Sequence, residues 1–220
     1  MVYVRKPNKE NVPLNNKSLS AESALVFAKL EEHGLLLRID ANLPNVCALV
    51  AGERVRGSWW SHPSGRAIFA VDGELAHHPD VLMTKLISGK VTYVHRALWS
   101  QVIAVGRSRE PWQMKDLSTD GRRLLAQVDR KPVEPDRRAS KAASELETRL
   151  LVYSEQFHSE SGAHGRRLES WDHWSNRIGN VGEPIAAVSG GRLLEEVVAS
   201  LNRKFKGSGR LPWQGRSSSR

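Results

Sequence analysis

Residues able to perform acid–base chemistry gather in the segment FHSESGAHGRRLES, around a glycine break. Histidine and glutamate side chains act as general acids, general bases and metal ligands. His158 and His164 lie six residues apart, so a continuous helix would place them on different faces, unlike the i and i+4 histidines of a zinc-protease helix. If Gly162 turns the chain, the two rings could converge. The candidate catalytic residues are therefore His158, Glu160 and His164, and the alternative is a polar helix bend or cap without chemistry.

A pair of adjacent tryptophans lies among basic residues in the segment RVRGSWWSHPSGR. Neighbouring side chains of a strand point to opposite faces, so Trp59 and Trp60 cannot both enter a core from an extended segment. A long irregular loop needs an apolar anchor, and we expect Trp59 to supply it while Trp60 stays free for a ligand. Indole rings stack on bases and arginines bind phosphates, so this composition indicates a nucleic-acid contact.

Further candidate contacts follow on two β-rich runs, VLMTKLI and VTYVHR, which predict a hairpin. Lys90 lies at the expected tip and Lys85 on the first strand. His95, beside Arg96, could read a base or hold a phosphate, and the alternative is a strand-end histidine satisfied by the backbone. The predicted nucleic-acid contacts are Arg54, Arg56, Trp59, Trp60, Arg66, Lys85, Lys90, His95 and Arg96.

Motifs of several common enzyme classes are missing. The sequence has no G-x-x-x-x-G-K-[ST] loop, no G-x-G-x-x-G motif after a strand and no serine nucleophile elbow. His77, His78 and Asp80 carry metal-ligand chemistry without a separated partner set, so they are typical of a helix end. The single cysteine, Cys47, excludes an internal disulfide, and its apolar segment is typical of a core residue. We expect neither a metal nor a cofactor.

Local patterns predict the elements that position these side chains. Ser20 can cap a first helix that Gly34 ends, and a short strand at residues 35–39 follows. Two more helices are expected, in LPNVCALVAG and in GRAIFAVDGELAHHP, the latter with Ile68, Phe69, Val71 and Leu75 as its apolar set. With the hairpin, the order is helix, strand, helix, helix, strand, turn, strand. This is the order of the winged-helix variant of the helix-turn-helix, whose third helix enters the major groove.

The second half of the chain has helical patterns. One helix is expected in DLSTDGRRLLAQV, and the apolar stripe Leu146, Leu150, Tyr153 and Phe157 predicts a long helix from Ala139. Two helices follow, in RRLESWDHWSNRIG and IAAVSGGRLLEEVVASLNRKF. The predicted fold class is α+β, mainly α, with a winged-helix-like N-terminal domain and a helical C-terminal region. The expected division is a flexible arm (1–17), a winged-helix-like domain (18–106), a connector (107–141), a helical domain (142–204) and a basic disordered tail (205–220).

Charge narrows the class of partner. The 220-residue chain carries a net charge of +9, and residues 203–220 alone hold six basic residues and no acidic one. A balance of this kind favours an acidic partner, nucleic acid first, with anionic membrane as the rival. The sequence shows no apolar run long enough for a signal peptide or a membrane span. With a single cysteine, this predicts a cytoplasmic protein that does not bind membranes.

Three blocks, RGSWWSHPSG, HPDVLMTKLISGKVTYVHRALW and ESGAHGRRLESW, are similar to blocks found together in a family of uncharacterised bacterial proteins. The resemblance extends over residues 20–175. It implies a bacterial, cytoplasmic origin. Because the family has no established activity, it implies no catalytic residue.

Together these observations predict a protein that binds nucleic acid, with duplex DNA as the favoured ligand, through the winged-helix-like domain and the basic tail. One alternative is an enzyme acting on nucleic acid or nucleotides, a repair-type hydrolase or lyase with its site at residues 155–167. That reading requires the loop at 56–62, His95 and the bend at 155–167 to converge in one cleft. A further alternative is a non-catalytic scaffold that forms a homodimer through the stripe from Leu146 to Phe157.

Overall fold

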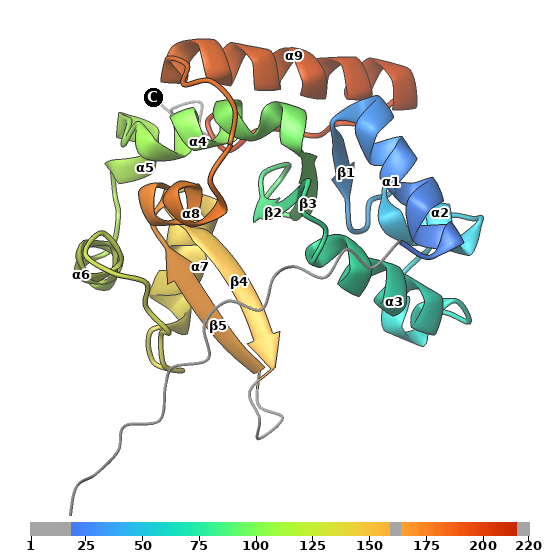
Figure 1. The fold of residues 1–220 in the computed structure, drawn as a ribbon, viewed down its shortest axis with the longest axis horizontal. Helices are drawn as coiled ribbons and strands as arrows, with labels where there is room; N and C mark the ends of the chain where they lie inside the picture. Colours follow the sequence, from blue (N-terminus) through green and yellow to red (C-terminus); the bar gives the residue numbers. More distant parts are fainter. Residues whose placement is uncertain (1–18, 159–163, 215–220) are drawn as a thin grey trace, which may run out of the picture.

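The first half of the chain folds as three helices against a three-stranded sheet. The structure is a computed structural model that describes residues 19–158 and 164–214 (Figure 1). Up to residue 95 its elements are α1 (Ala21–His33), β1 (Leu35–Leu37), α2 (Val46–Ala51), the 3-10 turn η1 (Trp59–Ser61), α3 (Gly65–Ala76), β2 (Val81–Lys85) and β3 (Val91–His95). The sheet is antiparallel, with strand order β1-β3-β2. The predicted order of elements is confirmed.

Short polar side chains cap the helices of this half. The Ser20 hydroxyl accepts a hydrogen bond from the backbone N–H of Ser23 at 3.3 Å, as the sequence predicts for α1. The side-chain oxygen of Asn45 accepts one from the N–H of Ala48 at 2.9 Å, and its amide donates to the Leu43 carbonyl at 2.9 Å. A cap of this kind stabilises a helix by about 1 kcal/mol. This matters most for α2, which is only six residues long.

The predicted hairpin is formed by β2 and β3. Ser88 and Gly89 both have positive φ, 53° and 69°, and the N–H of Lys90 donates to the Ile87 carbonyl at 2.9 Å. Two consecutive left-handed residues turn the chain within the loop that joins the strands. In the ladder Lys85 lies opposite Val91 and Thr84 opposite Thr92, so residues 86–90 form the connection.

The second half adds helices on either side of a second hairpin. Its elements are η2 (Arg96–Leu98), α4 (Trp99–Arg107), α5 (Pro111–Met114), α6 (Thr119–Val128), α7 (Ser140–Thr148), β4 (Tyr153–His158), β5 (His164–Glu169), α8 (Trp171–Ile178) and α9 (Ala187–Phe205). Figure 1 shows α9 lying along α4 at one edge of the molecule. Helices predominate over strands in the described residues, which confirms a mixed α+β fold that is mainly α.

One large apolar core joins the two halves of the chain. It combines Leu35 of β1 and Val94 of β3 with Trp99 of α4, Trp171 of α8 and Leu194 of α9, all almost fully buried. A smaller core packs α6 and α7 around Leu125, Val128 and Leu146. Residues on both sides of the predicted connector therefore share one interior.

The prediction of a long helix from Ala139 to Phe157 is wrong. Helix α7 ends at Thr148, and the chain turns through Leu150, which has a left-handed φ of 54°. The N–H of Leu151 donates to the Leu146 carbonyl at 3.0 Å, the bond that closes a helix C-terminus of this type. A left-handed residue with a side chain costs about 1–2 kcal/mol, which burial of the Leu150 side chain offsets. Because Leu146 and Leu150 are fully buried within the chain, they offer no surface stripe for a dimer.

The expectation of a disordered tail is wrong for residues 205–214. Phe205 is the last residue of α9, and Leu211 is 1% exposed within the large core. The side chain of Asn202 binds Gly209 in both directions, accepting from its N–H at 2.7 Å and donating to its carbonyl at 2.8 Å. Residues 215–220 lie outside the described residues, as do residues 1–18, where the flexible arm is predicted.

No helix within residues 19–158 and 164–214 is both long and apolar enough to cross a bilayer.

Candidate nucleic-acid interface

Helix α3 divides its side chains between the core and the outside. Successive helical residues are rotated by about 100°, so positions 66, 69, 70 and 73 fall on one side. Ile68, Val71 and Leu75 are buried, whereas Arg66, Phe69 and Ala70 are exposed. Phe69, which the pattern assigned to the apolar set, is 52% exposed. The outward side of α3 therefore presents a cation and an aromatic ring near its N-terminus.

The two tryptophans that precede α3 have different environments. Trp59 packs against the buried side chains of Val55 and Ile68, whereas Trp60 is 64% exposed. Their rings stack with centroids 4.0 Å apart, and the Trp60 ring lies 5.4 Å from that of Phe69. The expectation that Trp59 anchors the loop is confirmed, and Trp60 is exposed as expected, whereas its contact with a ligand stays a prediction. The result is an exposed aromatic surface made of Trp60 and Phe69, supported from below by Trp59.

Gly65, the first residue of α3, permits this arrangement. A β-carbon at this position would lie 3.1 Å from the carbonyl oxygens of Trp59 and Trp60, closer than such contacts normally come. The N–H of Gly65 donates to the His62 carbonyl at 2.8 Å. A glycine therefore lets η1 sit directly on the N-terminus of α3, which brings Trp60 beside Phe69.

A partly buried polar triad fixes α3 against the sheet. Asp72 of α3 accepts hydrogen bonds from the Arg38 guanidinium at 2.7 and 3.1 Å, and the hydroxyl of Tyr93 on β3 donates to the same carboxylate. Tyr93 is fully buried. Burial, and after it the Asp72 charge, raises the pKa of Tyr93, so the phenol keeps its proton. The triad sets the orientation from which the outward side of α3 is displayed.

A cavity of about 460 Å³ opens next to the tryptophan loop and is lined by several basic side chains. Its lining includes Arg54, Arg56 and Lys90, with Asp40 as its carboxylate. Lys90 pairs with Asp40 at 2.7 Å. Arg54 donates to the Ala41 carbonyl and to the Asn42 side chain, which are neutral acceptors, so its charge is not balanced by these contacts. The cavity therefore keeps a positive charge suited to a phosphate group.

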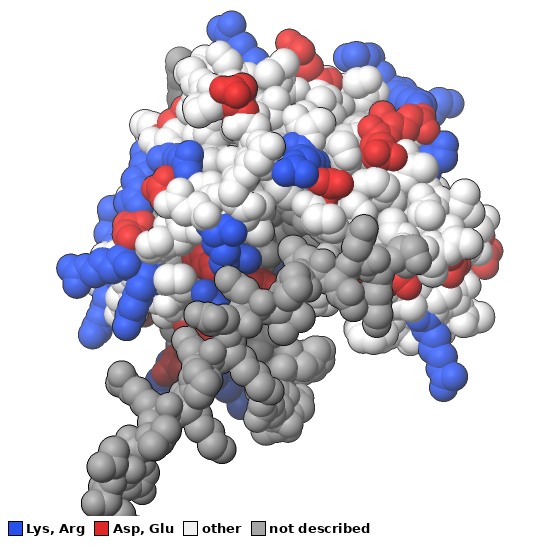
Figure 2. Space-filling view, in the orientation of Figure 1, with Lys and Arg blue, Asp and Glu red and all other residues white. Residues whose placement is uncertain are grey.

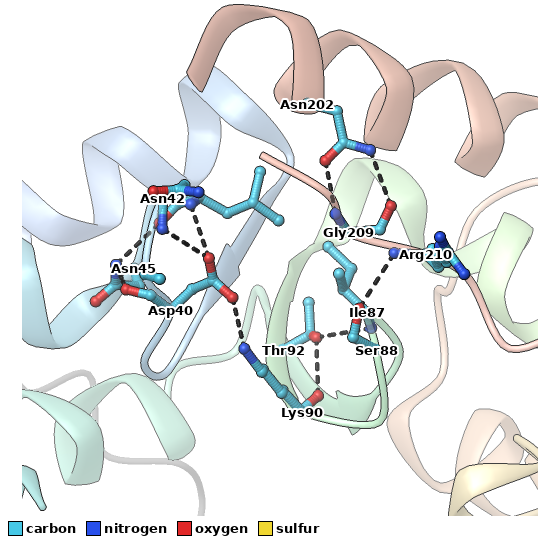
Figure 3. Close-up of polar contacts among 12 residues, drawn as sticks. Asp40, Asn42, Asn45, Ile87, Ser88, Lys90, Thr92, Asn202, Gly209 and Arg210 are labelled. Carbon is cyan, nitrogen blue, oxygen red and sulfur yellow. Dashed lines mark hydrogen bonds and ion pairs between the residues drawn. The ribbon is translucent and has the colours of Figure 1, made fainter. Parts of the chain in front are cut away.

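Three other predicted contacts are engaged in ion pairs, which the sequence did not indicate. Lys85 pairs with Glu147 at 2.7 Å. Lys90 pairs with Asp40, also at 2.7 Å, as Figure 3 shows. The Arg96 guanidinium pairs with Asp80 at 2.8 Å. Each of these cations already has a carboxylate partner, so its binding to a phosphate would have to compete with that pair.

The ring of His95 makes its contacts within the fold. Its ring accepts a hydrogen bond from the N–H of Ala97 at 3.4 Å and lies 5.8 Å from the ring of Phe27. The strand-end alternative, a histidine satisfied by the backbone, agrees with this geometry.

The tip of the hairpin contacts the C-terminal segment. The N–H of Ser88 donates to the Arg210 carbonyl at 2.7 Å, and the N–H of Arg210 donates to the Ser88 hydroxyl at 3.2 Å (Figure 3). Asn202 of α9 holds the neighbouring Gly209. Most of the polar groups at this turn are therefore occupied by the chain itself.

The candidate catalytic residues fall on the second hairpin and its loop. His158 and His164 are paired directly opposite each other across β4 and β5. Their side chains, and Glu160 as a whole, lie outside the described residues. The carboxylate of Glu169 in the same hairpin is 1% exposed and pairs with Arg167 at 3.0 Å and Arg177 at 2.9 Å. The catalytic set stays a prediction.

The convergence that an enzyme would require is not seen in the cavities near the loop. The two cavities around residues 29–57 include Arg54, or Arg54 and Arg56, but no residue of the described part of the β4–β5 hairpin. Among the described side chains, no group of three or more His, Cys, Asp or Glu is placed to hold a metal ion.

Two features of this region were not predicted from the sequence. Phe69 was assigned to the core because it lies between Ile68 and Val71. Adjacent helical positions differ by about 100° in direction, and this difference leaves Phe69 exposed while Ile68 is buried. The triad of Asp72, Arg38 and Tyr93 joins residues 21 to 55 positions apart, which no local spacing reveals.

Comparisons of the chain with family models, with curated proteins and with solved structures gave no match. The resemblance to an uncharacterised bacterial family therefore stays a prediction.

Proposed function

We propose that the chain binds nucleic acid, with duplex DNA as the ligand, through the outward side of α3 and the loop before it. The observation that carries this proposal is the exposed aromatic surface of Trp60 and Phe69, flanked by the exposed Arg66. Exposed apolar patches rimmed by polar groups mark binding sites. Aromatic rings stack on or wedge between bases, and arginine binds guanine edges or phosphates.

The order of elements and the sheet order β1-β3-β2 support a winged-helix assignment, with α3 as the recognition helix. The major groove, about 12 Å wide, admits one α-helix, and N-terminal residues of the recognition helix reach the base edges. Arg66 and Phe69 occupy that end of α3. Ala70 and Gly73, on the same side, let the helix backbone approach the groove closely. The cavity lined by Arg54 and Arg56 supplies a phosphate contact.

The wing has a smaller part in this proposal than in a typical winged helix. The hairpin tip is bonded to Arg210, and its cations Lys85 and Lys90 are paired with carboxylates. The proposal therefore assigns binding to α3, Trp60 and the loop at 54–57.

Fluorescence anisotropy with a labelled duplex tests the proposal. We expect Trp60→Ala and Arg66→Ala each to weaken binding by about 1–3 kcal/mol, which is about 5- to 150-fold in Kd. Leu25→Ala and Arg203→Ala are matched controls, because both side chains are exposed and lie on other helices, α1 and α9. They should change Kd less than twofold, by about 0.4 kcal/mol or less.

Two results would overturn the proposal. One is wild-type protein that binds neither duplex nor single-stranded DNA at low salt. The other is a Trp60→Ala, Arg66→Ala double variant that binds as tightly as the Leu25→Ala control. An aromatic surface that captures a protein instead of DNA would give the second result.

A further inference from the structure

A second group of cations lies far along the chain from α3, on α6 and the turns around it. It comprises seven exposed side chains, here called the α6 surface: Arg122, Arg123, Arg130, Lys131, Arg137, Arg138 and Lys141. Within the described residues, the salt bridges of the chain include none of these seven, although they include the neighbouring pair of Arg109 and Asp129 at 2.5 Å. The α6 surface therefore holds charges that the fold leaves unpaired.

The charge of this region is concentrated and has a rigid support. Residues 119–141 contain seven basic and four acidic residues, and one of the four, Asp129, is already paired with Arg109. Figure 2 shows Lys and Arg side chains gathered on the left of the molecule, where Figure 1 places α5 and α6, with some acidic side chains among them. Leu124, Leu125 and Val128 bury the opposite side of α6. The cations thus project from a packed helix.

Part of this arrangement is unfavourable for the fold itself. Arg137 and Arg138 precede Ala139, the N-cap residue of α7, and Lys141 lies in the first turn. The Asp136 carboxylate, which accepts a hydrogen bond from the N–H of Ala139 at 3.0 Å, offsets only part of this positive charge. The helix macrodipole disfavours positive charge at this end. An anion bound between these side chains would relieve both the dipole repulsion and the mutual repulsion of the cations.

The composition of the surface indicates the kind of anion. The exposed large hydrophobic side chains of the described residues include Trp60, Phe69 and Leu193, but none within residues 119–141. Protein interfaces and membrane-inserting surfaces bury apolar or aromatic anchors, which this surface lacks. Surfaces that bind a phosphate backbone consist of Lys and Arg with little else.

We propose that the α6 surface binds the sugar-phosphate backbone of nucleic acid without reading its sequence. This inference rests on the proposed function for its ligand and adds a second contact region, separate from α3. Each lysine or arginine that neutralises a phosphate releases a counterion, so contacts of this type appear in the salt dependence of binding.

The test is the slope of log Kd against log salt for duplex binding by the full-length chain. In the variant Arg123→Ala, Arg130→Ala, Lys131→Ala, three contacts are removed, and we expect the slope to fall by about 2.7. Between about 50 and 200 mM salt, wild type should therefore lose about 40-fold more affinity than this variant does. Circular dichroism and thermal unfolding check that the variant stays folded, as expected for exposed side chains.

The matched control removes the same charge elsewhere. Arg192→Ala, Arg203→Ala, Lys206→Ala removes three exposed cations of α9 and its end and should leave the slope unchanged within about one unit. An equal fall in both triple variants, or an unchanged slope in the α6 variant, overturns the inference. So does binding to anionic phospholipid vesicles that the α6 variant loses while its duplex binding stays at the wild-type level.

These measurements distinguish a failure of the α6 inference from a failure of the proposed role of α3. If Trp60→Ala weakens duplex binding and the α6 variant does not, only the α6 inference is overturned. If the α6 variant lowers the slope while the Trp60→Ala, Arg66→Ala double variant binds as tightly as the Leu25→Ala control, the proposed role of α3 is overturned and the inference about the α6 surface is supported.

Discussion

The triad that holds α3 in place makes a quantitative prediction about stability. In Tyr93→Phe the Asp72 carboxylate loses one donor but keeps both hydrogen bonds from Arg38, at 2.7 and 3.1 Å, so no charge is stranded. A hydrogen bond to a charged group contributes about 1.5–3 kcal/mol. For a chain of 220 residues, each kcal/mol lowers Tm by about 2–4 °C, so we expect a decrease of about 3–12 °C.

Urea unfolding followed by circular dichroism measures this loss. A cycle with Asp72→Asn and the double variant isolates the coupling between the two side chains, which should exceed about 1 kcal/mol. Because the pKa of Tyr93 is raised in the folded state, its contribution should be complete below the ordinary pKa of 10 and should decline as pH rises further. Unfolding free energies of wild type and Tyr93→Phe within about 0.5 kcal/mol, with equal m-values, would refute the role of the triad.

Two further predictions concern other titratable groups. Hydrogen bonds from Lys29 and then Lys204 lower the pKa of Glu32 from its ordinary 4.5 to about 2. The excess stability of wild type over Glu32→Gln should therefore be constant above about pH 5 and disappear as pH falls toward 2, and a pH-independent difference in urea titrations would contradict this. Burial raises the pKa of the Cys47 thiol to about 11. Iodoacetamide at about pH 8 should leave native Cys47 unmodified and label it in concentrated urea, as mass spectrometry can show, whereas rapid labelling of the native protein would contradict its burial.

The local elements of the first half could be predicted from sequence because their signals are local. Ser20 and Gly34 bound α1, and a Gly-containing turn joins two β-rich runs into the β2–β3 hairpin. The different environments of Trp59 and Trp60 also followed from a local argument, because a long irregular loop needs an apolar anchor and one of the two rings can supply it.

The second hairpin was missed because its spacing imitates a helix. Leu146, Leu150 and Tyr153 recur at steps of four and three, but each belongs to a different element or turn: α7, the left-handed turn and β4. β4 is held as a strand by its hydrogen-bonded pairing with β5. The residues of β5 follow the break that was interpreted from the sequence as a bend.

The candidate site was predicted in part. Arg66 and Trp60 are exposed as expected, whereas the pairing of Lys85 with Glu147 joins residues 62 positions apart and leaves no local pattern. The contact of the hairpin tip with Arg210 likewise leaves no local pattern in the sequence. It fixes a segment that was predicted to be disordered, and the neighbouring Leu211 is buried in the core.

The most direct measurement for the central claim is photocross-linking of the wild-type chain to a bromodeoxyuridine-substituted duplex, with the linked peptides located by mass spectrometry. The account predicts cross-links in the peptide that contains Trp60 and Phe69, competed away by unlabelled duplex and lost in Trp60→Ala. Competed cross-links confined to peptides outside residues 54–77 would contradict the assignment of α3 and its preceding loop as the nucleic-acid interface.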